Sequence, residues 1–132
     1  MSAIRDAADA APGRHALVLV LVGGMAGTAL RLGVDAALAP PWATLAVNLV
    51  GALVLGFLFE RLVDARRLRG GLWSALGPGL CGALTTFSAL QLEAVELMRD
   101  GSWKGAALYL AATVCLGLPL AALGRRLGRA VR

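Results

Sequence analysis

The sequence predicts an all-α membrane protein with four transmembrane helices, and three observations lead to this fold class. Hydrophobic residues make up 58% of the 132 residues and charged residues 16%, whereas soluble domains are about half apolar and about a quarter charged. Four apolar stretches approach the roughly 20 residues that a helix needs to cross a bilayer. The thirteen Lys and Arg flank these stretches instead of covering a soluble surface.

The four apolar stretches define the expected spans in order along the chain. They are expected at about residues 15–34, 43–62, 72–92 and 103–123. The loop "APPWAT" follows the first span, and the charged segment "RLVDARRLRGG" separates the second from the third. Trp42, Trp73 and Trp103 fall at span edges, where the aromatic residues of membrane proteins collect. The domain organisation is therefore a polar tail (1–14), a four-helix membrane domain (15–124) and a basic tail (125–132).

The distribution of positive charge predicts one orientation in the membrane. With four spans, both ends of the chain and the middle loop lie on one side, which carries Arg5, Arg14, Arg61, Arg66, Arg67, Arg69, Arg125, Arg126, Arg129 and Arg132. The opposite side carries only Arg31, Arg99 and Lys104. Lys and Arg concentrate in the cytoplasmic loops of membrane proteins, so both termini are expected in the cytoplasm. The membrane is expected to be the plasma membrane, which would be the inner membrane of a bacterium.

The third span is predicted to be broken near its middle. Its first half reads "GPGLCGALTT", in which Pro78 lies between two glycines and two β-branched threonines follow Gly82. Proline removes a backbone donor, and glycine tolerates a break. Unwound backbone at membrane depth persists where it is buried or lines a wet cavity, and its carbonyls can hold a cation. A simple proline kink is the alternative from these residues alone.

Polar side chains inside the spans are the candidates for function, since such residues are costly in a bilayer. Asn48 is the only amide in the second span, and either tethers neighbouring helices or offers N–H donors to an anion. Tyr109 and Thr113 are four residues apart in the fourth span, so they share a helix face. This pair fits helix packing as well as a polar stripe along a pore.

Catalytic and disulfide chemistry find little support in the sequence, and the protein is not expected to be an enzyme. The chain has one histidine, His15, and shows no Ser–His pair. Cys81 and Cys115 lie inside apolar stretches and are interpreted as small core residues. No acidic residue lies in the middle of the first or second span, where a proton-coupled exporter would need one.

Three segments on successive spans resemble the signature segments of the Fluc fluoride channels, also called CrcB. They are "GGMAGTALR" (23–31), "TLAVNLVGALVLG" (44–56) and "GLCGALTTFSALQLE" (79–93). The resemblance covers nearly the whole chain, and the TTFS core behind G-x-x-T is its most specific part. It implies an antiparallel dimer of four-helix subunits with two narrow fluoride pathways and a structural sodium ion at the dimer centre.

The resemblance also implies roles for individual residues. The sodium ligands would be the backbone carbonyls of Gly82 and Thr85. The resemblance places six residues on or beside the fluoride pathway: Asn48, Thr86, Phe87, Ser88, Tyr109 and Thr113. It places Arg31 and Glu93 near the vestibules. Neutral hydrogen-bond donors can replace the hydration shell of fluoride without trapping the ion, and the positive edge of the Phe87 ring can contribute.

The sequence departs from the family pattern at three positions and in its charge distribution, and one of these positions is Ala89, where the family usually has threonine. Ala83 stands where the family usually has a second glycine. Leu90 stands where it usually has a second phenylalanine, so one ring of the pathway is absent. An antiparallel homodimer needs a chain that inserts both ways, whereas this chain has strongly biased charge. The sequence therefore predicts one half of a heterodimer with an inverted homologous partner, and a dual-topology homodimer is the alternative.

Two other functions compete with passive fluoride export that lowers cytoplasmic fluoride. A small four-helix proton-coupled exporter of the multidrug type would need a glutamate within the first span, where the sequence reads "VLVLVGGMAGTAL". A non-transporting membrane interaction protein would leave Asn48 and the TTFS segment unexplained.

Overall fold

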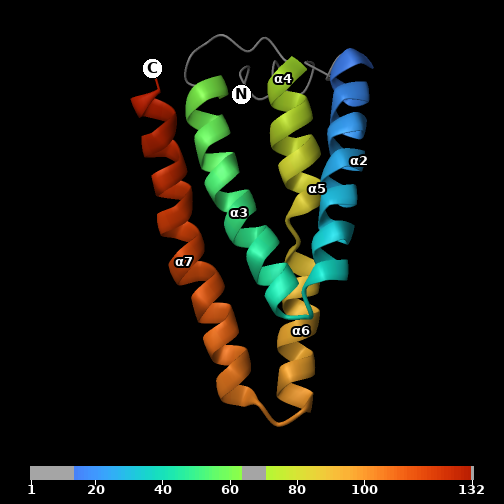
Figure 1. The fold of residues 1–132 in the computed structure, drawn as a ribbon, viewed down its shortest axis with the longest axis vertical. Coiled ribbons are helices and arrows are strands. Elements are labelled where there is room, and N and C mark those ends of the chain that lie inside the picture. The colour runs from blue at the N-terminus through green and yellow to red at the C-terminus, as the bar shows by residue number, and fades with distance from the viewer. Residues whose placement is uncertain (1–13, 64–70, 132) are drawn as a thin grey trace, which may run out of the picture.

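The structure is a computed structural model that describes residues 14–63 and 71–131, and this part of the chain is helical apart from short connections (Figure 1). The elements are α2 (Arg14–Ala37), α3 (Trp42–Leu58), η1 (Phe59–Val63), α4 (Gly71–Ser74), η2 (Ala75–Cys81), α5 (Gly82–Leu84), α6 (Phe87–Arg99) and α7 (Trp103–Ala130). The two η elements are π-helices that continue their neighbours. The start of α2 and the end of α7 lie at the same end of the molecule (Figure 1).

Three of these helices are long and apolar enough to cross a membrane, with bounds close to those expected. They are Arg14–Ala37, Trp42–Leu62 and Trp103–Ala130. Trp42 and Trp103 begin their helices and are exposed, as expected for aromatic residues at a membrane interface. The helix α7 continues six residues into the segment that was expected to be a basic tail. The expected N-terminal tail before Arg14 and the core of the middle loop (64–70) lie outside the described residues.

The third expected span is interrupted, and the break lies at the C-terminal end of the segment 77–86 in which it was expected. The helix passes through Pro78 as the π-helix η2 and continues through Gly82 in α5. A π-helix absorbs the missing proline N–H with a wider turn, so the chain need not unwind there. The break comes at Thr85 and Thr86, and Figure 1 shows it as a thin non-helical connection between α5 and α6.

The helix α2 packs closely on the first half of the interrupted span. A Cβ atom added to Gly23 would overlap the carbonyl of Ala75, and one added to Gly27 would overlap the carbonyl of Leu80. Small residues let helices approach backbone to backbone in lipid, where no hydrophobic force brings them together. The "GGMAG" pattern is therefore a packing face against η2.

The helices α3 and α7 form a second closely packed pair and lie side by side in Figure 1. A Cβ atom on Gly56 would overlap the carbonyl of Ala121, and one on Gly124 would overlap the carbonyl of Leu53. The lower part of α7 also contacts α6. Buried Leu90, Ala94 and Tyr109 form the hydrophobic cluster at that contact, so α7 joins the broken span to α3.

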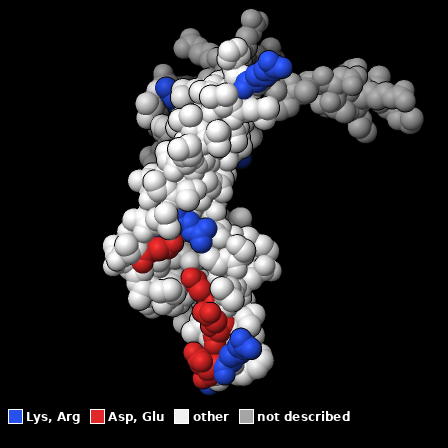
Figure 2. Space-filling model, turned by 90° about the vertical axis from the view of Figure 1, so that its right-hand side faces the viewer, with Lys and Arg blue, Asp and Glu red and all other residues white. Residues whose placement is uncertain are grey.

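The charged side chains leave a broad apolar zone between them. Figure 2 shows basic side chains near the upper end, both signs in the lower half, and uncharged atoms between. Of the two cysteines, Cys81 is buried as expected, whereas Cys115 is exposed on α7, so its interpretation as a core residue was wrong. In a bilayer, a side chain on the outer face contacts lipid and can be as apolar as one in the core. The hydropathy of Cys115 therefore does not tell which of the two positions it occupies.

Candidate functional site

The break in the third span is closed by a side chain from another helix. Thr85 and Thr86 are both extended, with φ/ψ of −81°/154° and −147°/127°. The Nδ2 of Asn48 on α3 donates to the Thr86 carbonyl at 3.0 Å, and the Thr86 N–H donates to Asn48 Oδ1 at 2.8 Å. An amide offers one donor and one acceptor in this geometry, so Asn48 replaces the helical acceptor that the Thr86 N–H has lost and gives the Thr86 carbonyl a side-chain donor.

The same break removes the usual helical donors from two carbonyls. In a continuous helix, the Thr86 N–H would bind the carbonyl of Gly82, and the Ala89 N–H would bind that of Thr85. Here the Thr86 N–H goes to Asn48, and the Ala89 N–H donates to Thr86 Oγ1 at 3.2 Å. The carbonyls of Gly82 and Thr85 are thus released from the helix, and they are the two carbonyls that the family resemblance singles out.

The hydroxyl of Thr86 serves as the N-cap of α6. It accepts the Ala89 N–H and lies 3.3 Å from the hydroxyl oxygen of Ser88. The neighbouring Thr85 hydroxyl instead turns back and donates to the Cys81 carbonyl at 2.9 Å. The two threonines of the TTFS segment therefore hold the two helix ends on either side of the break. Ser88 itself is exposed beside Thr86.

A groove of about 670 Å³ runs along α3 and α7 and reaches the break. Its polar lining at that end comes from Asn48, Thr85, Thr86 and Thr113, and its remaining lining is mostly apolar. Phe87 also lines the groove and is 70% exposed, so its ring is available to an ion or to a second subunit. The groove brings together side chains from α3, α6 and α7 that lie far apart in the sequence.

A buried carboxylate lies beside this groove at the contact of α3, α6 and α7. Glu93 accepts the hydroxyl of Thr44 on Oε1 at 2.7 Å and the hydroxyl of Tyr109 on Oε2 at 2.6 Å. All three side chains are less than a tenth exposed. Each carboxylate oxygen has its own donor, which is how a buried charge is stabilised in a low dielectric.

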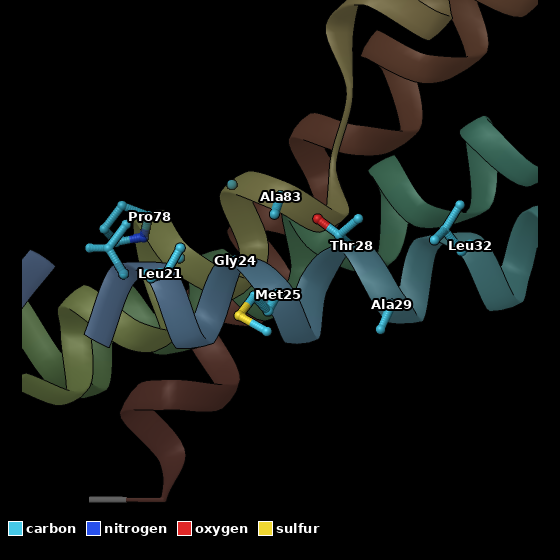
Figure 3. A pocket seen from close by; sticks show the side chains of 11 residues that line it. Leu21, Gly24, Met25, Thr28, Ala29, Leu32, Pro78 and Ala83 are labelled. Atoms are coloured by element: carbon cyan, nitrogen blue, oxygen red, sulfur yellow. The ribbon is translucent and has the colours of Figure 1, made fainter. Parts of the chain in front are cut away.

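A second groove of about 750 Å³ lies on the outer face formed by α2 and η2 (Figure 3). Figure 3 shows Leu21, Met25 and Thr28 following one another along α2, with Pro78 and Ala83 on the neighbouring elements. Leu21 and Met25 are both about two-thirds exposed. This face leaves Leu21 and Met25 open to lipid or to another subunit.

Comparison with known proteins identifies the family. The chain matches the family described as "CrcB-like protein, Camphor Resistance (CrcB)" over residues 18–125. It belongs to the CrcB family. It is 38% identical over 121 residues to the "Fluoride-specific ion channel FluC 1" of Mycobacterium bovis, covering 88% of this chain and 92% of that relative. It is 42% identical over 121 residues to the "Fluoride-specific ion channel FluC" of Xylella fastidiosa strain 9a5c, covering 86% and 84%.

A third CrcB relative carries a different number in its name. The "Fluoride-specific ion channel FluC 2" of Listeria monocytogenes is 37% identical over 106 residues, covering 80% of this chain and 81% of that relative. Membership in the CrcB family agrees with the resemblance of the three signature segments. Those segments lie in α2, α3 and the broken third span. The second and third segments contribute Asn48 and the break to the groove, whose other wall is α7.

The structure gathers some of the residues expected from the CrcB resemblance and separates others. Asn48, Thr86, Phe87 and Thr113 line one groove. Tyr109 and Thr113 do not present their hydroxyls together, because the Tyr109 hydroxyl binds Glu93 and the Thr113 hydroxyl donates to the Tyr109 carbonyl at 2.9 Å. Glu93 is buried, so it lies inside the contact of three helices.

Arg31 lies apart from the groove, and Leu90 is buried. Arg31 pairs with Asp35 one turn along α2, with 3.6 Å between Nε and Oδ2. Leu90 lines the groove and packs in the cluster with Ala94 and Tyr109. A leucine therefore occupies the place of the usual second ring as a core side chain.

Two functional candidates were missed from the sequence. Thr44 lies one turn before Asn48 on α3, a spacing that places both on one helix face, and this signal could have been used. Glu60 is buried in η1 and pairs with Arg125 and Arg129 of α7. Its signal was an acidic residue at the end of an apolar span, with two arginines four residues apart at the end of another.

Proposed function

We propose that this chain is a subunit of a fluoride-specific ion channel that lets fluoride leave the cytoplasm passively. The observation that carries the proposal is the groove in which Asn48, Thr86, Phe87 and Thr113 meet at the helix break. The CrcB relatives named above are fluoride channels by name, which supports the same permeant ion. No enzymatic reaction is part of this proposal.

The chemistry of the groove suits fluoride because its polar groups are neutral. Fluoride is small and strongly hydrated, so dry apolar walls alone would exclude it. Amide and hydroxyl donors can replace part of its water, and because these side chains are uncharged they let the ion leave again. The edge of the exposed Phe87 ring carries partial positive charge and adds a weak contact.

A sodium ion is proposed at the dimer centre, held by the backbone carbonyls of Gly82 and Thr85. Both carbonyls have lost their helical donors, and neutral oxygens from unwound backbone suit a hard monovalent cation. Two carbonyls from each of two subunits would supply four ligands. When bound, the ion supplies a fixed positive charge that stabilises the break, and it is not transported.

The proposed assembly is an antiparallel dimer that buries the outer face of α2 and η2. The apolar groove on this face adjoins Gly82, so a second copy or a homologue covering it would approach the released carbonyls. The charge bias favours an inverted homologous partner, with a homodimer as the alternative. Robust fluoride flux from this chain expressed alone would contradict the heterodimer.

The membrane arrangement proposed is four passes with both termini in the cytoplasm, the third pass being the interrupted segment from α4 to α6. This places residues 15–124 in one membrane domain of a bacterial inner membrane. Cysteine labelling from each side of the membrane would test it. Labels on residues introduced in the α6–α7 connection and after Arg129 should react from opposite sides.

Fluoride efflux from liposomes tests the function. We expect fluoride to leave much faster than chloride, and the Asn48→Asp and Phe87→Ile variants to slow it. Efflux driven by a proton gradient and abolished without one would favour the multidrug-type exporter instead. No flux of either anion, alone or with the partner subunit, would favour a non-transporting role.

A further inference from the structure

A buried carboxylate holds two arginines at the end of the bundle where α7 ends. Glu60 in η1 is 4% exposed, and its two oxygens bind Arg125 Nε at 3.3 Å and Arg129 Nε at 2.8 Å. The two arginines are one turn apart on α7, so both reach the same carboxylate. A Cβ atom on Gly128 would approach the Glu60 Cβ at 2.9 Å, so α7 can reach Glu60 this closely only with glycine at that position.

Of these two arginines, Arg125 belongs to the groove that reaches the helix break. Arg125 and Phe59 line one end of it, whereas Asn48 and Thr113 line the other. The Arg125 guanidinium lies over the Phe59 ring, 5.8 Å from its centroid. This cation–π contact holds the Arg125 side chain in place in addition to its ion pair with Glu60. Twelve residues separate Thr113 from Arg125 on α7, or about 18 Å along a helix.

The charges at this end do not cancel. One carboxylate faces two guanidinium groups, so the group of three keeps one net positive charge. The Arg125 side chain is 49% exposed despite its pairing, and it can meet an anion from solution. A positive group at the mouth of a cleft with apolar walls concentrates anions there, because low-dielectric walls focus its field.

We propose that Arg125, held in place by Glu60 and Phe59, is a positioning residue that attracts fluoride into the groove from the side of the termini. The inference rests on the proposed channel function, and on the proposed orientation it puts Arg125 at the cytoplasmic entrance. Arg125 collects the anion and the neutral donors at the break pass it on. This separation keeps the charged side chain at the entrance and leaves uncharged side chains along the rest of the groove, so that no cationic side chain retains fluoride there.

The test is the initial rate of fluoride efflux at low fluoride concentration, in whichever assembly conducts, this chain alone or with its partner subunit. We expect Arg125→Gln to slow entry from the side of the termini about threefold or more at low ionic strength. The loss should shrink at high salt, since screening weakens attraction to an exposed charge. Arg125→Lys should restore most of the rate.

The neighbouring Arg126→Gln is the matched control. It removes the same charge from the next residue, which is exposed and does not line the groove. We expect it to change the rate much less than Arg125→Gln. Thermal unfolding of each variant separates attraction from folding, and Arg125→Gln leaves Glu60 its shorter contact with Arg129.

Equal rates for the wild type and Arg125→Gln, or equal slowing by the two glutamine variants, would overturn the inference while leaving the channel function intact. Slowing by Arg125→Gln that does not depend on salt would also overturn it, because it would point to a structural role. A wild-type assembly that conducts no fluoride in either form would instead contradict the proposed function itself.

Discussion

Asn48 and Thr86 are joined by two hydrogen bonds across the break in the third span, one in each direction. The pair is 38 residues apart in sequence and links α3 to the start of α6. Because the N–H and the carbonyl of Thr86 both bind this one side chain, a neighbouring helix stabilises the local structure of the break. From this relationship we expect a single amide on α3 to matter for both folding and ion passage.

Asn48→Asp should reduce both fluoride flux and stability. The aspartate can still accept the Thr86 N–H, but it places an acceptor against the Thr86 carbonyl and adds negative charge to the groove. We expect flux to fall about tenfold or more, and the free energy of unfolding to fall by about 1–3 kcal/mol. Efflux assays and thermal unfolding in detergent measure the two effects. Val50→Ala, at an exposed position of α3, is the control and should leave flux near wild type.

Glu93→Gln should destabilise the contact between α3, α6 and α7. The carboxylate accepts one hydroxyl on each oxygen, whereas glutamine keeps one acceptor and turns an NH₂ group toward the other hydroxyl. A buried hydroxyl that must reorient or lose its acceptor costs about 1–3 kcal/mol. Chemical unfolding of the purified protein measures the change. The exposed Glu96→Gln on the same helix should cost much less, and equal losses would contradict the role of the buried network.

Gly56→Ala should weaken the packing of α3 on α7. The added Cβ would overlap the carbonyl of Ala121, so the two helices must move apart. Overpacking of this kind costs about 1–3 kcal/mol. Gly33→Ala is the control, because nothing lies within 4 Å of its added Cβ and alanine favours a helix. A lower unfolding temperature for Gly33→Ala than for Gly56→Ala would show that helix contact is not the cause.

Removal of sodium should lower the unfolding temperature if the released carbonyls of Gly82 and Thr85 hold the ion. A ligand at tenfold excess over its Kd stabilises the folded state by about 1.4 kcal/mol. Thermal unfolding in sodium chloride, potassium chloride and a bulky organic chloride at equal ionic strength measures the effect. We expect sodium to give the highest unfolding temperature. Identical values in all three salts would rule out a sodium site of useful affinity.

The starts of α3 and α7 could be predicted well from sequence because apolar runs and flanking tryptophans carry that information directly, whereas α7 continues past the expected end at residue 123, to Ala130. The start of α7 at Trp103 is as expected, and α3 begins one residue before the expected span, at Trp42. The break lies at Thr85 and Thr86, the last two residues of the segment 77–86 that was expected to unwind, because a π-helix accommodates Pro78 and the glycines before them. The break depends on Asn48, which only tertiary structure brings to Thr86.

The site residues show the same limit. The polar type of Asn48, Thr86 and Thr113 could be predicted, but their partners could not. Tyr109 and Thr113 share a helix face by spacing, yet the long Tyr109 side chain reaches Glu93 on another helix. Glu60 could not be recognised as a buried residue from hydropathy, because a charged residue at the end of an apolar stretch is ordinarily interpreted as the end of the span. Its burial depends on two arginines that lie 65 and 69 residues farther along the chain.

The dependence of Thr86 on Asn48 also constrains biogenesis. The ribosome delivers α3 before the interrupted span, so the amide is already in the bilayer when Thr86 arrives. Until the two meet, the Thr86 N–H has no partner, and an unpaired donor in a bilayer is costly, which favours early docking of α6 on α3. Interchanging the order of these two passes in the gene would remove that template and hinder insertion.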